Sequence, residues 1–258
     1  MEQATVQNIY DWLNSIAPFE TQEDFDNAGL QAGLPGAKVS NVLLTLDVTE
    51  EVIKETESIG AELIISHHPL IFTPLSSLNE QDLIASLIAR LIRGRTALIA
   101  AHTNLDQSET FSGSFAVAEL LGLDKIHKQG KYLFIGELPA PVTADALKDR
   151  AGFALSAPVL RFGDPEQSIT RLAIAGGSYS EGLHEALNAG AQALLTGEVR
   201  HHHAVEASAK GLVLFEGGHF VTEQPMLPKL AAGLQMAMDT LKYKVRVHVS
   251  RCVPYRLG

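Results

Sequence analysis

The chain has little of several features that define common protein classes. It contains one cysteine, Cys252, in 258 residues, which excludes both an intrachain disulfide and a zinc site built from cysteines. Its apolar runs all fall short of the ~20 residues that a membrane-spanning helix needs. The N-terminal segment MEQATVQNIYDWLNSI has neither the basic start nor the long apolar stretch of a signal peptide. These absences make a cytoplasmic protein the expectation.

Positive charge is also scarce. Lys and Arg number 20 against 30 Asp and Glu, which gives a formal net charge of −10. No stripe rich in Lys and Arg is present to grip a phosphate backbone, so we do not expect nucleic acid among the partners. With 46% hydrophobic and 19% charged residues, the composition is that of an ordinary globular protein that can bury a sizeable core.

Short apolar strands alternate with amphipathic helices along the chain. The sequence predicts strands at 41–47, 62–66, 96–101, 171–177, 211–218 and 244–250, and helices at 5–16, 80–92, 112–121, 143–151 and 225–241. A further helix is predicted between Thr49, which can cap its N-terminus, and Gly60, which can end it. We expect a proline-containing linker around 139–141. Strands that alternate with helices favour an α/β fold with largely parallel pairing in its core.

A long internal repeat relates the two halves of the sequence. When the chain is shifted by 130 residues, the segment 42–68 lies over the segment 172–198 without a gap, and strand, helix, glycine stop and second strand recur in register. Chance similarity between strand–helix–strand units is the alternative explanation. We expect a single compact unit, 1–258, built from two related and interleaved α/β lobes at about 1–125 and about 126–258.

A histidine followed four positions later by an acidic residue also recurs in the two halves. After a shift of 117 residues, HTNLD lies over HFVTE, and each segment follows an apolar strand. Loops at the carboxyl ends of strands form the ligand crevice of open α/β sheets. Three such loops carry side chains of the kind that bind metals: His67 with His68, His102 with Asp106, and His219 with Glu223. If the two lobes face each other, these loops meet at one metal-binding cleft.

Imidazole and carboxylate together suit Zn, Mn, Fe or Co, and several ligands that include a carboxylate suit a two-metal site. In the plainer interpretation, His67 and His68 are core or loop histidines with ordinary hydrogen bonds. The run HHH at 201–203 is typical of a solvated helix start, although Glu198, at the repeat position of His68, and one of these histidines could line the same cleft. AGGSYSEG at 175–182 has neither GxGxxG nor Walker spacing, which favours a tight strand-to-helix turn over a phosphate loop.

Five short motifs occur in a specific order along nearly the whole chain. They are DNAGLQAG at 26–33, SHHPLIF at 66–72, HTNLD at 102–106, TGEVRHH at 196–202 and GHFVTE at 218–223. Together they resemble the family of Ngg-one-interacting-factor-three-like proteins, which are also known as GTP cyclohydrolase I type 2 homologues. Some members of that family carry an extra domain inserted in mid-chain. This sequence is too short for that domain and resembles the compact form.

The resemblance implies two related α/β lobes around a dinuclear metal centre, and an assembly of six copies in a ring. The metal ligands that it implies are His67, His68, Asp106, His219 and Glu223. We place His102 beside the metals, either behind the ligands or facing the substrate. The expected cofactors are two divalent ions per chain, of Zn, Fe, Mn or Co.

The chemistry that this set of residues supports is metal-assisted hydrolysis, because two cations can share a water molecule, lower its pKa and stabilise the oxyanion that forms on attack. We expect a hydrolase that acts on a nucleotide or a related small molecule, with GTP cyclohydrolase activity implied by the resemblance only. The alternatives are a non-catalytic metal-binding or regulatory protein, and a scaffold whose histidines are structural.

Overall fold

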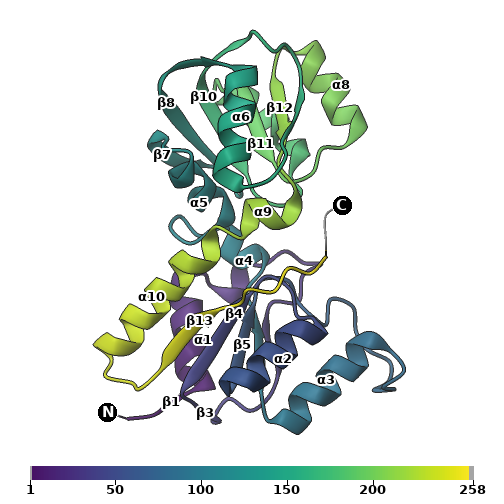
Figure 1. Cartoon of the computed structure of the whole chain (residues 1–258), viewed down its shortest axis with the longest axis vertical. Coiled ribbons are helices and arrows are strands. Elements are labelled where there is room, and N and C mark those ends of the chain that lie inside the picture. The colour runs from purple at the N-terminus through teal and green to yellow at the C-terminus, as the bar shows by residue number, and fades with distance from the viewer. Residues whose placement is uncertain (1, 256–258) are drawn as a thin grey trace. The chain divides into compact units, whose positions relative to one another are not determined.

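The computed structural model describes residues 2–255 and forms two compact units (Figure 1). The first unit combines the residues up to Ser108 with those from Leu227 onward, and the second spans Glu109–Met226. This division differs from the expected boundary near residue 125, because the chain returns to the first unit at its C-terminal end. There the strand β13 (Arg246–Val249) forms a parallel ladder with β4 (Asn41–Thr45).

The sheet of the first unit has the strand order β13-β4-β5-β6-β2. The three strands not yet placed are β5 (Leu63–Ser66), β6 (Ala97–Ala100) and β2 (Gly29–Ala32). In this sheet, β13, β4, β5 and β6 pair in parallel with their neighbours. At the edge, β2 pairs antiparallel with β6. The predicted α/β fold with a largely parallel core is therefore confirmed for this unit. Parallel strands also bring their carboxyl ends to one edge of the sheet.

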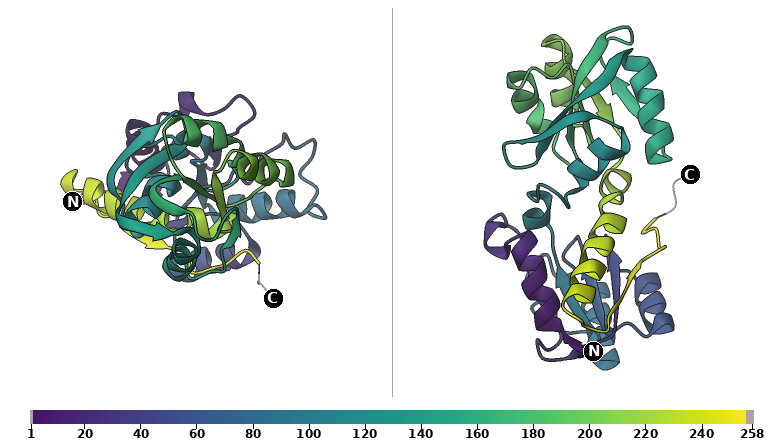
Figure 2. Two further views of the ribbon diagram at one scale, coloured as in Figure 1. Left: turned by 90° about the horizontal axis from the view of Figure 1, so that it is seen from above. Right: turned by 90° about the vertical axis from the view of Figure 1, so that its left-hand side faces the viewer.

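Helices cover both faces of this sheet. They are α1 (Val6–Ile16), α2 (Glu50–Ile59), α3 (Leu83–Gly94) and α10 (Met226–Thr240). α1 and α10 lie on one face and α2 and α3 on the other (Figure 2). As predicted, Thr49 caps α2 by accepting a hydrogen bond from the backbone N–H of Val52, and Gly60 ends it in the left-handed conformation with φ 64°.

The second unit contains a six-stranded sheet with the order β7-β8-β10-β11-β12-β9. Its strands are β7 (Asp124–Gln129), β8 (Leu133–Thr143), β9 (Leu160–Phe162), β10 (Ser168–Ala175), β11 (Ala193–Thr196) and β12 (Val213–Glu216). β10, β11 and β12 are parallel, and β8 and β9 flank them antiparallel. This central arrangement again confirms the predicted parallel core.

The predicted linker around 139–141 is wrong, because β8 continues through both of its prolines. A proline cannot donate a ladder hydrogen bond, so it is tolerated in a strand only at an edge or a bulge. Both conditions hold here. The ladder with β7 ends at Glu137, and the ladder with β10 shifts register between Ile169 and Arg171.

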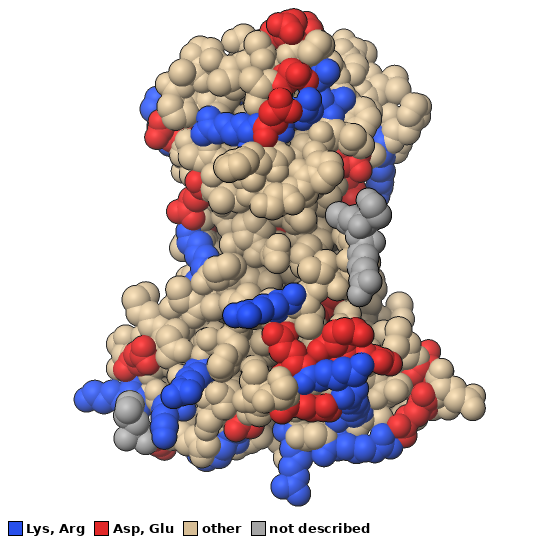
Figure 3. Space-filling model, in the orientation of Figure 1, with Lys and Arg blue, Asp and Glu red and all other residues tan. Residues whose placement is uncertain are grey.

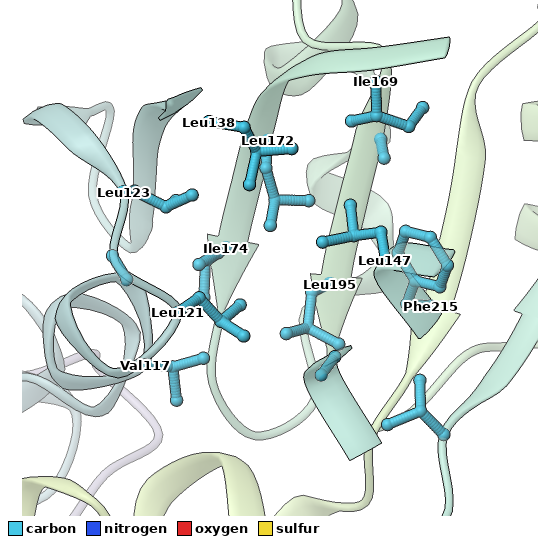
Figure 4. Packing of buried hydrophobic residues seen from close by; sticks show 14 of the residues in the cluster. Val117, Leu121, Leu123, Leu138, Leu147, Ile169, Leu172, Ile174, Leu195 and Phe215 are labelled. Atoms are coloured by element: carbon cyan, nitrogen blue, oxygen red, sulfur yellow. The ribbon is translucent and has the colours of Figure 1, made fainter. Parts of the chain in front are cut away.

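The core of the second unit lies between this sheet and two helices, α5 (Gly113–Leu120) and α6 (Ala144–Leu155). Val117 from α5 and Leu147 from α6 face Ile174 and Leu195 of the central strands (Figure 4). α6 runs four residues beyond the predicted end at 151. On the other face, α7 (Leu183–Asn188) and α8 (His201–Ala209) connect the parallel strands.

The two units share a four-strand arrangement. In each, three parallel strands are connected by helices, and an antiparallel strand that precedes them in the chain pairs with the third. The register of the first two strands also repeats at the 130-residue shift, since Val42 lies opposite Leu63 and Leu172 lies opposite Ala193. This likeness is what a duplication predicts.

Among residues 2–255, no helix has both the length and the apolar character needed to cross a membrane. On the face shown in Figure 3, Lys and Arg side chains are interspersed with Asp and Glu and form no continuous basic stripe.

Candidate functional site

Three histidines gather at the carboxyl edge of the first unit's sheet. His67 and His68 directly follow β5, and His102 lies between β6 and the short helix α4 (Thr103–Asp106). One ring nitrogen of each histidine lies within 4.8 Å of the others. The ring centroids are 5.0 Å apart for His67 and His68, 5.2 Å for His67 and His102, and 5.6 Å for His68 and His102. The structure therefore brings together the first-unit histidines that the sequence had singled out.

Asp106 adds a carboxylate to this group. It ends α4, and its Oδ1 lies 3.5 Å from Nε2 of the buried His67. Asp106 stands four residues after His102, and its backbone N–H donates to the His102 carbonyl at 3.0 Å. The first unit thus presents three imidazoles and one carboxylate at one strand edge.

The Nδ1 atom of each of these histidines is held by an oxygen. His67 Nδ1 lies 2.8 Å from the backbone carbonyl of Ala101. A carbonyl only accepts hydrogen bonds, so this Nδ1 carries the proton, and Nε2 keeps the lone pair that can bind a metal. His68 Nδ1 lies 2.9 Å from Asp47 Oδ1. Metal-binding histidines are commonly oriented in this way by a carboxylate or a carbonyl behind the ring.

Asp26 provides the corresponding partner of His102. Its Oδ1 accepts from His102 Nδ1 at 2.8 Å, and its Oδ2 accepts from the backbone N–H and the hydroxyl of Thr103 at 3.0 and 2.5 Å. Burial raises the pKa of this carboxyl, but the hydrogen bonds from His102 and Thr103 outweigh burial and lower the pKa to about 2. Asp26 is therefore ionised at neutral pH and fixes the orientation of His102.

The second unit carries a smaller set of candidate ligands at the equivalent edge. The helix α9 (His219–Glu223) follows β12, and His219 Nε2 lies 3.2 Å from Oε1 of the buried Glu223. His219 Nδ1 lies 2.7 Å from Glu198 Oε1. His219 is thus oriented by a carboxylate in the same way as His68 and His102. Glu198 therefore belongs with this pair.

Glycines allow the backbone to pack closely around this pair. A Cβ at Gly177 would overlap the carboxylate of Glu223. One at Gly197 would lie 2.8 Å from His219 Cα and 2.5 Å from the carbonyl oxygen of Gly177. Gly177 also has φ 65°, within the turn that leads from β10 to the 3-10 helix Ser180–Gly182. The tight turn predicted for 175–182 is therefore confirmed.

The run of histidines at 201–203 opens α8, as predicted. His203 Nδ1 lies 2.8 Å from the hydroxyl of Ser180, and the rings of His202 and His203 stack edge to face at 4.1 Å. Within residues 2–255, the side-chain groups that could hold a metal include none of these three histidines. The solvated helix start is the interpretation that fits them.

Sequence reasoning missed two of the carboxylates that orient the histidines. Asp26 opens the motif DNAGLQAG, but the motif does not predict its contact with His102. Asp47 lies just beyond the carboxyl end of β4, so the rule that singled out the other strand-end loops would have found it. The contact between Asp26 and His102 spans 76 residues, and no local pattern in the sequence encodes it.

The donor atoms of the first unit fit a transition-metal ion. Imidazole nitrogens bind Zn²⁺ at ~2.1 Å, which places two such nitrogens about 3.4 Å apart around a tetrahedral ion. The ligand atoms of the buried His67 and the half-buried His68 and His102 lie within 4.8 Å of one another, so small movements of the two half-buried rings would be enough to reach that value. Neutral imidazoles and a carboxylate suit Zn, Fe, Mn and Co rather than Ca or Mg.

A profile of the Duf34/NIF3 (NGG1p interacting factor 3) family matches residues 4–254 of this chain. A Clostridium perfringens protein named GTP cyclohydrolase 1 type 2 homolog is 32% identical over 244 residues, which cover 91% of this chain and 93% of that protein. A Helicobacter pylori protein named GTP cyclohydrolase 1 type 2 is 31% identical over 221 residues, which cover 86% of this chain and 88% of that protein.

Solved structures agree with this match. A hypothetical protein from Staphylococcus aureus superposes with a TM-score of 0.93 at 26% identity, and 100% of each chain is covered. A Bacillus cereus protein related to NIF3 has the same fold, with a TM-score of 0.93, 21% identity and 100% of each chain covered. The family profile and the relatives both span nearly the whole sequence. This chain therefore belongs to the Duf34/NIF3 family.

Proposed function

We propose that this protein is a metal-dependent hydrolase that acts on a nucleotide or a related small molecule. The observation that carries the proposal is shared by four histidines: His67, His68, His102 and His219 each have Nδ1 held by an oxygen. This arrangement leaves Nε2 of each ring as the donor atom. The nucleotide class is supported by the names of the relatives, which refer to GTP.

We further propose that the ligands of both units serve one dinuclear centre. The proposed ligands are His67, His68, Asp106, His219 and Glu223. The second unit supplies only one imidazole and one carboxylate at α9, whereas a Zn²⁺ ion takes four ligands. An ion held by His219 and Glu223 therefore needs donors from elsewhere, and the resemblance to the family assigns them to the first unit.

The residues of the chain have distinct roles in this proposal. When bound, divalent ions would supply Lewis acidity and activate a water molecule for attack. Asp47 and Glu198 keep their histidines in the tautomer that presents Nε2. The five proposed ligands do not include His102. Its Nε2 is therefore available to accept a proton from the reacting group, and Asp26 would stabilise the imidazolium that results.

A second candidate function is supported by the first unit alone. His67, His68, His102 and Asp106 offer four donors, which is enough to saturate a tetrahedral ion. A saturated ion has no open position for a substrate. This arrangement would suit a non-catalytic metal-binding or regulatory protein.

The test begins with protein purified without chelators or nickel resin. We expect two ions per chain. We also expect either GTP cyclohydrolase activity or phosphoester hydrolysis, which should be lost on chelation and restored by the metal. His68→Ala and Glu223→Gln should each reduce turnover at least 100-fold while far-ultraviolet circular dichroism stays unchanged. One tightly held ion without turnover would favour the second candidate. Full activity in both variants would contradict the ligand assignment.

A further inference from the structure

Two exposed phenylalanines lie beside the first unit's histidines. Across residues 2–255 only three phenylalanines are exposed, namely Phe25 at 64%, Phe72 at 47% and Phe153 at 90%. Phe72 ends the motif SHHPLIF, and Phe25 directly precedes Asp26, the partner of His102. Two of the three exposed rings therefore belong to the loops that carry the candidate site.

These rings continue the histidine cluster outward. The ring centroids of Phe72 and His102 are 6.3 Å apart with an angle of 74° between their planes. Phe25 follows at 6.4 Å from Phe72 with an interplanar angle of 45°. His102 therefore meets Phe72 edge to face, and Phe25 tilts towards Phe72, so the two phenylalanines form an angled aromatic surface.

Hydrogen bonds hold the two loops together. The side chain of Asn27 donates to the backbone carbonyl of Ile71 at 2.5 Å. Gln31 donates to the same carbonyl at 3.2 Å and accepts from the N–H of Ile71 at 3.1 Å. Phe25 and Phe72 are each within two residues of this linkage. The aromatic surface is therefore positioned before a ligand arrives, which lowers the entropic cost of binding.

We propose that Phe25 and Phe72 bind the flat ring of an aromatic heterocycle, such as the nucleobase of a nucleotide, and place the bond to be broken at His102. The benzyl side chains offer π-faces and no hydrogen-bonding groups, so they select a planar ring over a sugar or a phosphate. Two side chains are also far too small an area for a stable protein interface, which buries about 800 Å² on each partner.

This inference rests on the proposed function for the reaction, but the ring binding can be measured without turnover. The probes are guanosine, which has a base and no phosphate, and inorganic tripolyphosphate, which has phosphate and no base. Both are titrated into wild type, Phe25→Ala, Phe72→Ala, Phe72→Trp and Phe153→Ala by calorimetry, alongside a count of bound metal.

Loss of a stacking partner weakens binding of a base by ~1–3 kcal/mol, which corresponds to about 5- to 150-fold in Kd. We therefore expect Phe25→Ala and Phe72→Ala each to weaken guanosine binding about tenfold. Tripolyphosphate binding and metal content should stay at wild-type values. Phe72→Trp should retain guanosine binding because it keeps a π-face, and Phe153→Ala should match wild type for both probes.

Unchanged guanosine binding in both alanine variants would overturn the proposal. Equal weakening of tripolyphosphate would also overturn it, since the rings would then act on the site as a whole. A change in sedimentation coefficient without a change in guanosine binding would assign the surface to a contact between proteins. A protein that binds guanosine through these rings but has no metal or turnover would refute the proposed hydrolase and leave the ring site standing.

Discussion

Both units contain three parallel strands with an antiparallel strand beside the third, yet the carboxyl edges of their sheets carry different chemistry. At the 130-residue shift, His67 and His68 correspond to Gly197 and Glu198. The first unit presents imidazoles at these positions. The second presents a glycine that allows close packing and a carboxylate that orients His219. At these two positions, the first unit thus presents candidate ligands, and the second presents residues that support a candidate ligand.

A second repeat position shows the same exchange. Asp47 in the first unit corresponds to Gly177 in the second. Asp47 holds His68, whereas Gly177 leaves the space that the Glu223 carboxylate occupies. The strand register fixes where a side chain stands, and the residue type then decides whether that place donates a ligand, orients one or makes room for one.

The largest effect on stability is expected from filling the space at Gly177. Gly177→Ala places a Cβ against Glu223 and forces an L-residue to adopt φ 65°. The two effects together should lower the free energy of unfolding of the metal-free protein by about 2–4 kcal/mol. Gly60→Ala is the matched control, since Gly60 has φ 64° and no atom within 4 Å of its Cβ position. It should cost about 1 kcal/mol.

Urea denaturation followed by circular dichroism measures both variants. If Gly177→Ala and Gly60→Ala lower the free energy of unfolding equally, the left-handed backbone conformation alone accounts for the loss, and the contact with Glu223 contributes nothing.

The carboxylates behind the histidines should control metal affinity in both units. Asp47→Ala and Glu198→Ala each remove the acceptor of an Nδ1 proton, so His68 and His219 lose a fixed tautomer and orientation. We expect each variant to bind the metal about 10- to 100-fold more weakly. The larger loss is expected for Asp47→Ala, because its ion pair is less exposed than that of Glu198.

Competition with a chromophoric chelator gives the affinities. Glu206→Ala is the control, since Glu206 pairs with Lys210 on the exposed part of α8 and orients no proposed ligand. Wild-type metal affinity in both Asp47→Ala and Glu198→Ala would contradict the proposal that these carboxylates orient metal-binding histidines in both units.

Asp26 should matter for stability as well as for the site. Asp26→Asn keeps the shape of the side chain but removes the charge that His102 and Thr103 bind. Hydrogen bonds to charged groups contribute ~1.5–3 kcal/mol, so the free energy of unfolding at neutral pH should fall by about 2 kcal/mol. Thermal unfolding checks this, and an unchanged melting temperature would contradict it.

Local signals in the sequence account for much of the fold. Thr49 and Gly60 bound α2 as predicted, because capping and a left-handed turn depend on neighbours within a few residues. α3 begins at Leu83 rather than at 80, since the side chain of Asp82 caps it. β8 could not be predicted through its prolines, because the loss of ladder partners beyond Glu137 is set by strands elsewhere in the chain.

The candidate site divides in the same way. The sequence identified His67, His68 and His102 because each follows an apolar strand, and the structure places them together. Of their partners, Asp47 also follows an apolar strand, but its contact with His68 is not encoded locally, and neither is that of Asp26 with His102, which spans 76 residues. Residue type and strand-end position can identify a candidate metal ligand, whereas its contact with the group that orients it depends on the folded arrangement.

The smallest expected effect comes from helix caps, where the two units should behave alike. Thr49 caps α2 in the first unit and Thr143 caps α6 in the second, each accepting from a backbone N–H three residues ahead, at 3.3 and 3.2 Å. Thr49→Ala and Thr143→Ala should each lower the free energy of unfolding by about 1 kcal/mol, because one helical N–H loses its partner. Since neither residue touches the candidate ligands, metal affinity should stay at the wild-type value in both. A cap variant that also weakened metal binding would show that the strand-end chemistry depends on the scaffold more broadly than through the orienting carboxylates.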